Sequence, residues 1–243
     1  MSRGGFTLIE VLVSIAIISV LIAILIPVLG STRLRAYELK SVSHLRQLGV
    51  TTTLYTNAYD SYYFGHGGML RPNNDSKPGG ISFPVWLLDR NWPVLIHRIA
   101  PWDTNFQLFI SPRTDAKPWF DLMNGSDIYT PLPTSYVYSN SFVAIPGNWN
   151  GSSGYQIDNN ATRSMRPWQV LYSSGKVLMY DGDLTYLGRE KLPTDGRPLL
   201  FADGSARVEI DSNATTPVQN RLRPLFNPII YHDTPMGIKG RDF

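Results

Sequence analysis

The side chains that most often carry out catalysis are present in this sequence, but their spacing does not suit it. The chain of 243 residues has no cysteine, which excludes thiolate nucleophiles, disulfides and thiolate metal sites. Its histidines show neither the i, i+3 or i, i+4 spacing of a helical metal site nor an HExxH pattern. They are His44, for which we expect a polar position on a helix, and His66, His97 and His232. The GxSxG, P-loop and GxGxxG patterns are also absent, so we predict no enzyme, no catalytic residue and no cofactor.

The acidic residues best placed for a metal are four aspartates in the last third of the chain. They are Asp181, Asp183, Asp195 and Asp203. Asp181-Gly182-Asp183 offers hard oxygen ligands of the kind that calcium prefers, but Asp-Gly pairs are also typical of turns. We favour the turn and predict no metal. Gly65-His66-Gly67-Gly68 resembles an oxyanion loop, but without a serine elbow it is interpreted as a loop.

The charge distribution gives no sign of a nucleic-acid partner. There are 22 lysines and arginines against 19 acids, a net charge of +3. A nucleic-acid binder gathers its excess on one face. The local basic cluster here is Arg33, Arg35, Lys40 and Arg46, with Glu38 among them. We interpret it as a solvated helix face beside a membrane.

The apolar residues are concentrated near the N-terminus. Of the 24 residues from Phe6 to Leu29, 19 are apolar, although the whole chain is 43% apolar. The uncharged run Val11–Leu29 would form a helix about 28 Å long, close to the thickness of a hydrocarbon core. It is too long for a cleaved secretory signal, and no A-x-A site follows it. The sequence therefore predicts a single membrane anchor that carries a soluble domain.

Glu10 is the exception within this apolar segment. A carboxylate costs on the order of 2–3 kcal/mol at the centre of a membrane helix and less near an interface. Glu10 therefore either stays solvated at the headgroup level or finds a positive partner inside an assembly. Physical chemistry alone leaves both alternatives open.

The residues around Glu10 match a known signal. Gly5-Phe6-Thr7-Leu8-Ile9-Glu10, followed by Val11-Leu12-Val13, resembles the class III signal of type IV pilins and type II secretion pseudopilins. The resemblance implies that a prepilin peptidase cuts between Gly5 and Phe6 and methylates the new N-terminal Phe6. It also implies that Glu10 pairs with the N-terminal amine of a neighbouring subunit, which would supply its counter-charge. Pro27 falls where many pilins carry a helix-kinking proline.

The same resemblance implies partners and a location. The partners are the prepilin peptidase, other pilin-like subunits and an inner-membrane assembly platform. The chain would cross the inner membrane once, with its C-terminal domain in the periplasm or outside the cell. The basic residues after the span weakly favour the opposite orientation. We follow the family, because its signal is more specific than a bias of a few charges.

The segment after Pro27 continues the helical pattern. It is rich in helix formers and free of proline as far as Asp60. Leu45, Leu48, Thr52 and Tyr55 follow i, i+3 and i+4 steps, with Leu34 on the same face. We predict one helix from Phe6 to about Ala58, with a kink at Pro27 and its end between Asn57 and Asp60.

The sequence pattern of the C-terminal third predicts a small β-sheet. Val177–Tyr180, Leu199–Ala202 and Ala206–Ile210 are short strand-like runs. Asp203-Gly204 between the last two predicts a type I′ hairpin. Packed on the long helix, these strands would make an α+β fold.

A second resemblance supports this arrangement. The stretch from Ser43 to Asp60 resembles a pilin-like family common in planctomycetes, whose members carry an H-X9-DG motif. The DG end matches Asp203-Gly204, but Pro193 stands where the histidine would be.

We therefore predict four parts in the chain. They are a cleaved leader at 1–5, a transmembrane helix at 6–29, the soluble half of the stem helix at 30–60 and a globular pilin-like domain at 61–243. The predicted function is that of a pilin-like structural subunit, a pseudopilin of a type II secretion or type IV pilus-like assembly. The alternative is an anchored binding protein that displays aromatic loops, since tryptophans are scattered through the middle. These tryptophans are Trp86, Trp92, Trp102, Trp119, Trp149 and Trp168.

Overall fold

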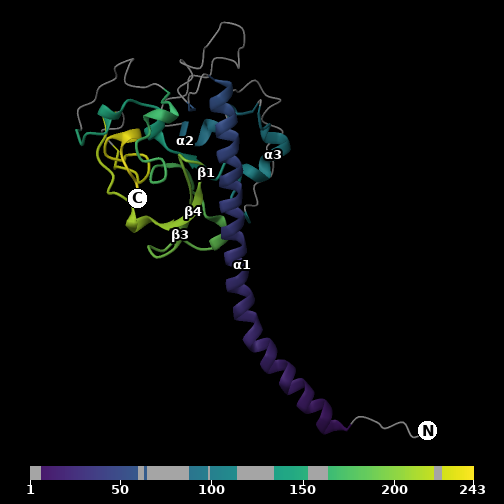
Figure 1. The fold of residues 1–243 in the computed structure, drawn as a ribbon. Helices are drawn as coiled ribbons and strands as arrows, with labels where there is room; N and C mark the ends of the chain where they lie inside the picture. Colours follow the sequence, from purple (N-terminus) through teal and green to yellow (C-terminus); the bar gives the residue numbers. More distant parts are fainter. Residues whose placement is uncertain are drawn as a thin grey trace.

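The computed structural model describes residues 7–59, 63–64, 88–97, 99–113, 134–152, 164–221 and 226–243. One long helix, α1, extends well beyond a rounded head formed by the rest of the described chain (Figure 1). The helices are α1 (Leu8–Ala58), α2 (Leu88–Asn91) and α3 (Trp102–Phe109). The strands are β1 (Tyr136–Tyr138), β2 (Val177–Asp181), β3 (Gly196–Phe201) and β4 (Ala206–Ile210). Short 3₁₀ turns connect them, among them η5 (Pro146–Asn148), η7 (Thr185–Leu187) and η9 (Gly237–Lys239).

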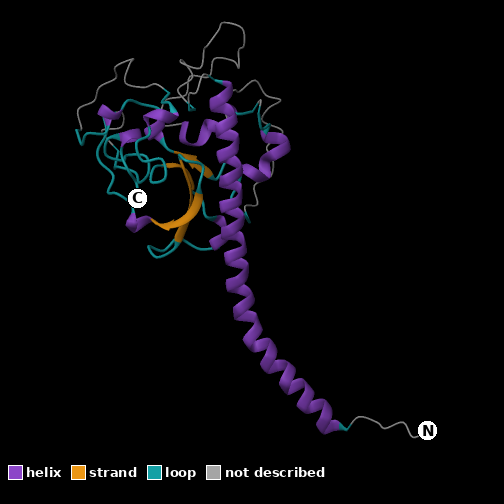
Figure 2. Ribbon diagram, viewed as in Figure 1, coloured by secondary structure: helices purple, strands orange, loops and turns teal. Residues whose placement is uncertain are grey.

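Helix α1 passes through two different surroundings. Its lower half, residues 8–33, projects away from the head, and its upper half, residues 34–58, lies against it (Figure 2). In the upper half Leu45, Leu48, Thr52 and Tyr55 are buried, as the sequence predicted. The helix ends at Ala58, within the predicted range.

The four strands form one antiparallel sheet in the order β1-β2-β3-β4. Each strand pairs with its neighbour in sequence, and the β3–β4 register runs from Gly196 opposite Ile210 to Leu200 opposite Ala206. Helix α1 packs on β3 and β4, so the molecule has the predicted α+β arrangement of a long helix on a small sheet. The three strands predicted from the sequence are present, and β1 is an additional one.

The β3–β4 hairpin corrects one prediction. A type I′ turn requires positive φ at both central residues. Here Gly204 has φ of +83°, whereas Asp203 is not among the residues with positive φ. The Gly204 amide donates to the Phe201 carbonyl, and the Phe201 amide donates to the Ser205 carbonyl. This is a type I turn followed by a left-handed glycine, another common hairpin loop.

The main core lies between α1, the sheet and the segments that follow α1. It contains Leu45 and Leu48 from the helix, Tyr136 and Tyr138 from β1, and Leu200 from β3. A smaller cluster on the other face of the sheet includes Val177, Phe201 and Tyr231.

A buried ion pair fixes the C-terminus without a disulfide. The Lys176 ammonium lies 3.2 Å from the Asp242 carboxylate and donates to the Thr234 hydroxyl. Asp242 also accepts a hydrogen bond from the Val177 amide at the start of β2. The last residues of the chain are therefore part of the packed head.

Candidate functional site

The first turn of α1 is closed by a capping box between Thr7 and Glu10. The Thr7 hydroxyl accepts a hydrogen bond from the Glu10 amide at 3.3 Å. The Glu10 carboxylate accepts hydrogen bonds from the Thr7 amide and hydroxyl, at 2.8 and 2.9 Å. This reciprocal arrangement satisfies helix N–H groups that would otherwise lack partners. It also places the carboxylate at the positive end of the helix dipole.

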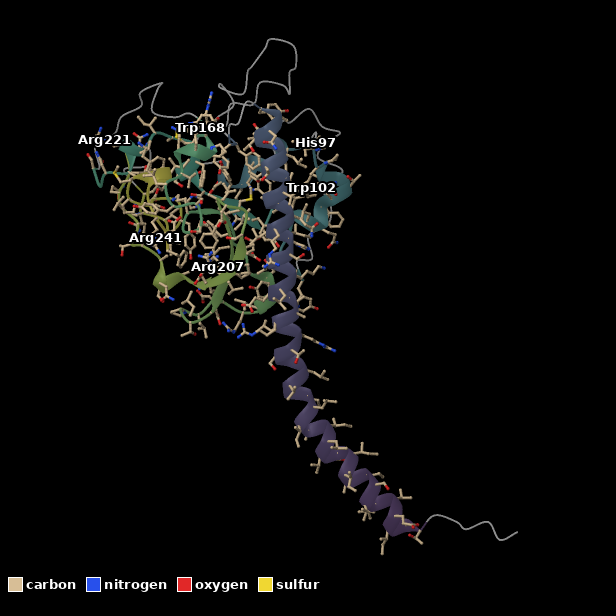
Figure 3. All side chains as sticks on the ribbon, viewed as in Figure 1. His97, Trp102, Trp168, Arg207, Arg221 and Arg241 are labelled. Atoms are coloured by element: carbon tan, nitrogen blue, oxygen red, sulfur yellow. The ribbon has the colours of Figure 1, made fainter. Side chains whose placement is uncertain are left out.

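The surface behind Glu10 is apolar and open on every side. Every described side chain from Leu8 to Arg33 is exposed, and Glu10 is the only charged residue between Thr7 and Arg33. Within the described part of the chain, α1 is the helix long and apolar enough to cross a membrane, and none of its apolar window is covered by the head. Figure 3 shows this segment as a stem whose side chains point outward all around. Such a surface requires a lipid or protein environment.

A buried polar network joins the upper half of α1 to the sheet. Asp181, at the end of β2, is fully buried, and its carboxylate accepts hydrogen bonds from the Ser41 and Ser111 hydroxyls, both at 2.7 Å. The amides of Asp183 and Leu184 donate to its other oxygen. Burial raises the pKa of the Asp181 carboxyl, and the hydrogen bonds from Leu184, Ser41 and Ser111 oppose the rise.

His44 extends this network and corrects an expectation. We expected a polar position on the helix, but His44 is buried, and its Nδ1 lies 3.1 Å from the Tyr136 hydroxyl. That hydroxyl lies 3.3 Å from the Ser41 hydroxyl. Burial lowers the pKa of His44. The Ser, His and Asp side chains that meet here are all enclosed in packed protein, so the cluster fastens the upper half of α1 to the head.

The structure describes only part of the predicted processing site. Gly5 and Phe6 lie outside the described residues. Glu10 lies in the first turn of α1, and the helix continues through Pro27. The functional roles of these four residues, including the kink at Pro27, stay predictions.

The four aspartates singled out in the sequence do not come together. Asp181 belongs to the network above, Asp195 pairs with Arg189 at 2.6 Å, and Asp203 accepts hydrogen bonds from Ser205 in the hairpin. Among the described residues, no group of three or more His, Asp or Glu is placed to hold a metal ion. Asp181-Gly182-Asp183 forms a turn after β2, as we favoured.

The histidines and tryptophans take mainly structural positions. His232 bridges the Tyr180 hydroxyl and the Asn140 amide, and the Trp102 amide donates to His97. Of the tryptophans that the structure describes, Trp92, Trp102 and Trp149 are buried and Trp168 is exposed. Trp86, Trp119, His66 and the Gly65–Gly68 run lie outside the described residues.

Comparison with known proteins gives two findings. Residues 1–26 match the family model described as the prokaryotic N-terminal methylation motif. The type IV wide pilus major component PilA4 of Thermus thermophilus is 33% identical over 81 residues, which is 33% of this chain. The chain spans 62% of the length of that relative. No solved structure matches. This chain has a methylation motif, a long N-terminal helix and a small antiparallel sheet, and over 81 residues it is similar to a type IV pilin.

Proposed function

We propose that this protein is a structural subunit of a type IV pilus-like or type II secretion-like assembly, a pseudopilin in the second case. The observation that carries this proposal is the lower half of α1. It exposes an apolar helical surface all around, with a single carboxylate in its first turn. A span of this kind can be stored in a membrane and later packed against the same span of other subunits. The similarity to a pilus major component supports this use.

The proposed location and partners follow from the same features. The lower half of α1 would cross the inner membrane once, and the head would lie in the periplasm or outside the cell. A prepilin peptidase would remove residues 1–5 and methylate Phe6. Other pilin-like subunits and a membrane assembly platform would then receive the processed chain. No step of this work requires a catalytic group or cofactor in the chain itself.

Glu10 has a defined role in this proposal. Within the described residues its carboxylate accepts hydrogen bonds from Thr7, and none of the ion pairs there includes it. Cleavage before Phe6 would create a new ammonium group within four residues of Glu10 in sequence. In a packed bundle, the amine of a neighbouring subunit would provide a counter-charge and offset the cost of removing the carboxylate from water.

Processing can be tested by intact mass spectrometry of the membrane-extracted protein. We expect the mature mass to lack residues 1–5 and to include one added methyl group. Gly5→Leu should retain the leader, because a bulky side chain replaces the glycine at the scissile bond. Gly4→Ala, one residue earlier, should still be cut. An uncut Met1 terminus in the unmodified protein would show that the processing proposal is wrong.

Assembly can be tested with Glu10→Ala, using Ser14→Ala as the matched control one turn further along. Ser14 donates only to the Glu10 carbonyl, so its loss changes no charge. Because the chain has no native cysteine, a single cysteine added in the lower half of α1 reports contacts between subunits. We expect Glu10→Ala to insert in the membrane but to lose most of its crosslinking, and Ser14→Ala to crosslink normally. Equal crosslinking of the two variants would contradict the assigned role of Glu10.

A further inference from the structure

The head meets α1 very close to the end of the apolar span. Contacts at the lower end of the head involve Tyr37 and Glu38. The Arg113 guanidinium lies 5.8 Å from the centre of the Tyr37 ring, and it donates to the Tyr186 carbonyl in η7. At the start of β3, a Cβ on Gly196 would lie 3.4 Å from the Glu38 carboxylate. The loop from η7 to β3 therefore lies at the lower edge of the head, on the side from which the stem emerges (Figure 1).

The distance from this edge to the lipid is short. From Leu29, the last residue of the apolar run, to Glu38 an α-helix rises about 14 Å. The headgroup layer of one leaflet takes up about 5–8 Å of that height. The remaining gap is about the length of one extended arginine or lysine side chain. No linker separates the span from the head that could hold the head away from the membrane, because α1 is one continuous helix from Leu8 to Ala58.

The charges on this edge are unevenly exposed. Arg35 has a side chain that is 76% exposed, whereas its partner Glu38 is 13% exposed. In the loop, Arg189 is 45% exposed and its partner Asp195 is 17% exposed. In both ion pairs the acid is covered and the base faces outward.

Four further residues belong to this surface. Arg33 and Lys40 of α1 are exposed. Glu190 is an exposed acid beside Arg189, so the positive excess is carried mainly by α1. Leu192 is 51% exposed in the loop. Figure 3 shows nitrogen atoms along this lower edge of the head. We call Arg33, Arg35, Lys40, Arg189 and Leu192 the membrane-proximal rim.

We propose that the membrane-proximal rim rests on the anionic headgroups of the membrane that holds the lower half of α1. The basic side chains would contact lipid phosphates, and Leu192 would reach the interfacial layer, where an exposed apolar side chain among charges is favourable. This inference rests on the proposed membrane anchoring. It also gives a function to the basic residues after the span, which run against the usual charge bias of membrane proteins. Before assembly, the head would be held down on the bilayer, and leaving the membrane would require breaking these contacts.

The proposal can be tested with single-cysteine variants of the full chain in vesicles, since no native cysteine interferes. A probe attached to Leu192→Cys measures how close the membrane-proximal rim lies to the lipid. Leu171→Cys is the matched control, since Leu171 is also an exposed leucine, 63% against 51%. Leu171 lies near the β3–β4 turn, because the Ser173 carbonyl, two residues further on, accepts a hydrogen bond from the Asp203 amide of that turn. The same turn lies beside the upper half of α1, since Gly204 is close to Gly49. Gly49 is 20 residues beyond Leu29, about 30 Å along the helix. A probe attached to Ile18→Cys measures whether the lower half of α1 is inserted in the bilayer.

The readout is quenching of a fluorophore on each cysteine by nitroxide-labelled lipids. In vesicles containing phosphatidylglycerol, we expect headgroup nitroxide to quench the Leu192 probe at least about twofold more than the Leu171 probe. We also expect this excess to fall in 1 M salt, where the Debye length is about 3 Å. Arg33→Glu with Lys40→Glu should reduce the excess. Lys239→Glu should not, because Lys239 is an exposed residue of η9, which packs on η5 away from the lower edge of the head (Figure 1).

The possible outcomes separate this inference from the proposed function. If chain-labelled lipid quenches the Ile18 probe but the Leu192 and Leu171 probes are quenched equally, the chain is anchored and the rim proposal is wrong. If the Ile18 probe is not quenched, the anchoring fails, and the rim proposal fails with it. An excess at Leu192 that does not depend on anionic lipid or salt would overturn the role given to the basic residues.

Discussion

The two halves of α1 have the same backbone structure but opposite surroundings. In the lower half, residues 8–33, every described side chain is exposed, and the hydrogen bonds of its serine, threonine and glutamate side chains stay within the helix and its N-cap. In the upper half, Ser41, Leu45, Leu48 and Tyr55 are buried against elements far away in sequence. The upper half therefore belongs to the folding unit of the head, whereas the lower half depends on lipid or on other subunits. One helix therefore connects a part that is packed into the core of the head to a part whose side chains are all exposed.

The largest expected effect comes from removing a core side chain of the upper half. Leu48 is fully buried, so Leu48→Ala should lower the free energy of unfolding of the head by about 3 kcal/mol, within the range of about 2–5 for such changes. Leu25→Ala in the lower half is the matched control, because Leu25 is 54% exposed. It should leave the unfolding of the head unchanged. Urea unfolding in detergent, followed by fluorescence of the buried tryptophans, measures both.

A destabilising effect of Leu25→Ala would contradict the comparison. It would mean that the lower half contributes to the stability of the head through α1 itself.

The next largest effect on the stability of the head comes from a carboxylate that contacts the upper half of α1, Asp181, and it is compared with Glu10 in the lower half. Asp181→Ala removes the acceptor of four donors: the buried hydroxyls of Ser41 and Ser111, the buried Leu184 amide and the part-buried Asp183 amide. The hydroxyls can turn toward other acceptors, but the amides cannot, and a buried unsatisfied donor costs about 1–3 kcal/mol. We expect a loss of about 2 kcal/mol in the stability of the head. Asp181→Asn keeps an oxygen for the amides and should recover most of it.

Glu10→Ala is the corresponding change in the lower half. Its carboxylate is exposed in the single subunit and bonds only within the first turn. We expect no change in unfolding of the head, although assembly is lost. Equal destabilisation by the Asp181 and Glu10 variants would show that the two halves are not independent.

The pH dependence of stability gives a smaller effect, which is confined to the upper half. Burial lowers the pKa of His44, so the unfolded chain takes up a proton there before the folded chain does. The stability associated with neutral His44 is present above the unfolded pKa of about 6.5 and is lost as the pH falls through the folded pKa. His44→Gln should therefore lose less stability than the wild type on acidification below pH 7.

Asp181 titrates in the opposite sense. Since its pKa is raised on folding, its contribution is largest below the unfolded value of about 3.9 and is lost as the pH rises toward the folded pKa. Measurements between pH 5 and 7 on the wild type and His44→Gln isolate the histidine. A parallel pH profile for the two proteins would contradict its burial as a neutral group.

The sequence predicted most of the backbone and little of the polar network. The long helix, its buried face at Leu45 and Leu48, and three strands all follow from periodicity and turn signals that act over a few residues. Strand β1 was missed because it is only three residues long and lies in a loop-rich region. The apolar lower half of α1, with Glu10 as its charged exception, could be predicted from the concentration of apolar residues near the N-terminus.

The Asp181 network was missed for a different reason. Its partners Ser41 and Ser111 are 140 and 70 residues away in sequence, so no local spacing could join them. Asp181 was noticed as a possible metal ligand and as part of an Asp-Gly turn, and His44 was placed on the helix but not in the core. A polar residue on the buried face of the helix, beside Leu45, was the available signal.

The smallest expected effect comes from the two glycines of α1, which differ in what a methyl group would meet. At Gly30 a Cβ would have no atom within 4 Å, whereas at Gly49 it would lie 2.9 Å from a methyl carbon of Leu200. Alanine improves a helix interior by about 0.5–1 kcal/mol, but inserting a methyl group into a packed core costs about 1–3 kcal/mol. Gly49→Ala should therefore destabilise the head by a net of about 1 kcal/mol, even though alanine is the better helix former. Gly30→Ala should leave the stability of the head unchanged and stabilise only the stem. Urea unfolding followed by tryptophan fluorescence measures the head, and unfolding followed by far-UV circular dichroism also includes the helical stem. If both alanines proved neutral or stabilising, the close contact between the upper half of α1 and β3 would not be a constraint on the helix, and its backbone would be free to shift on the sheet.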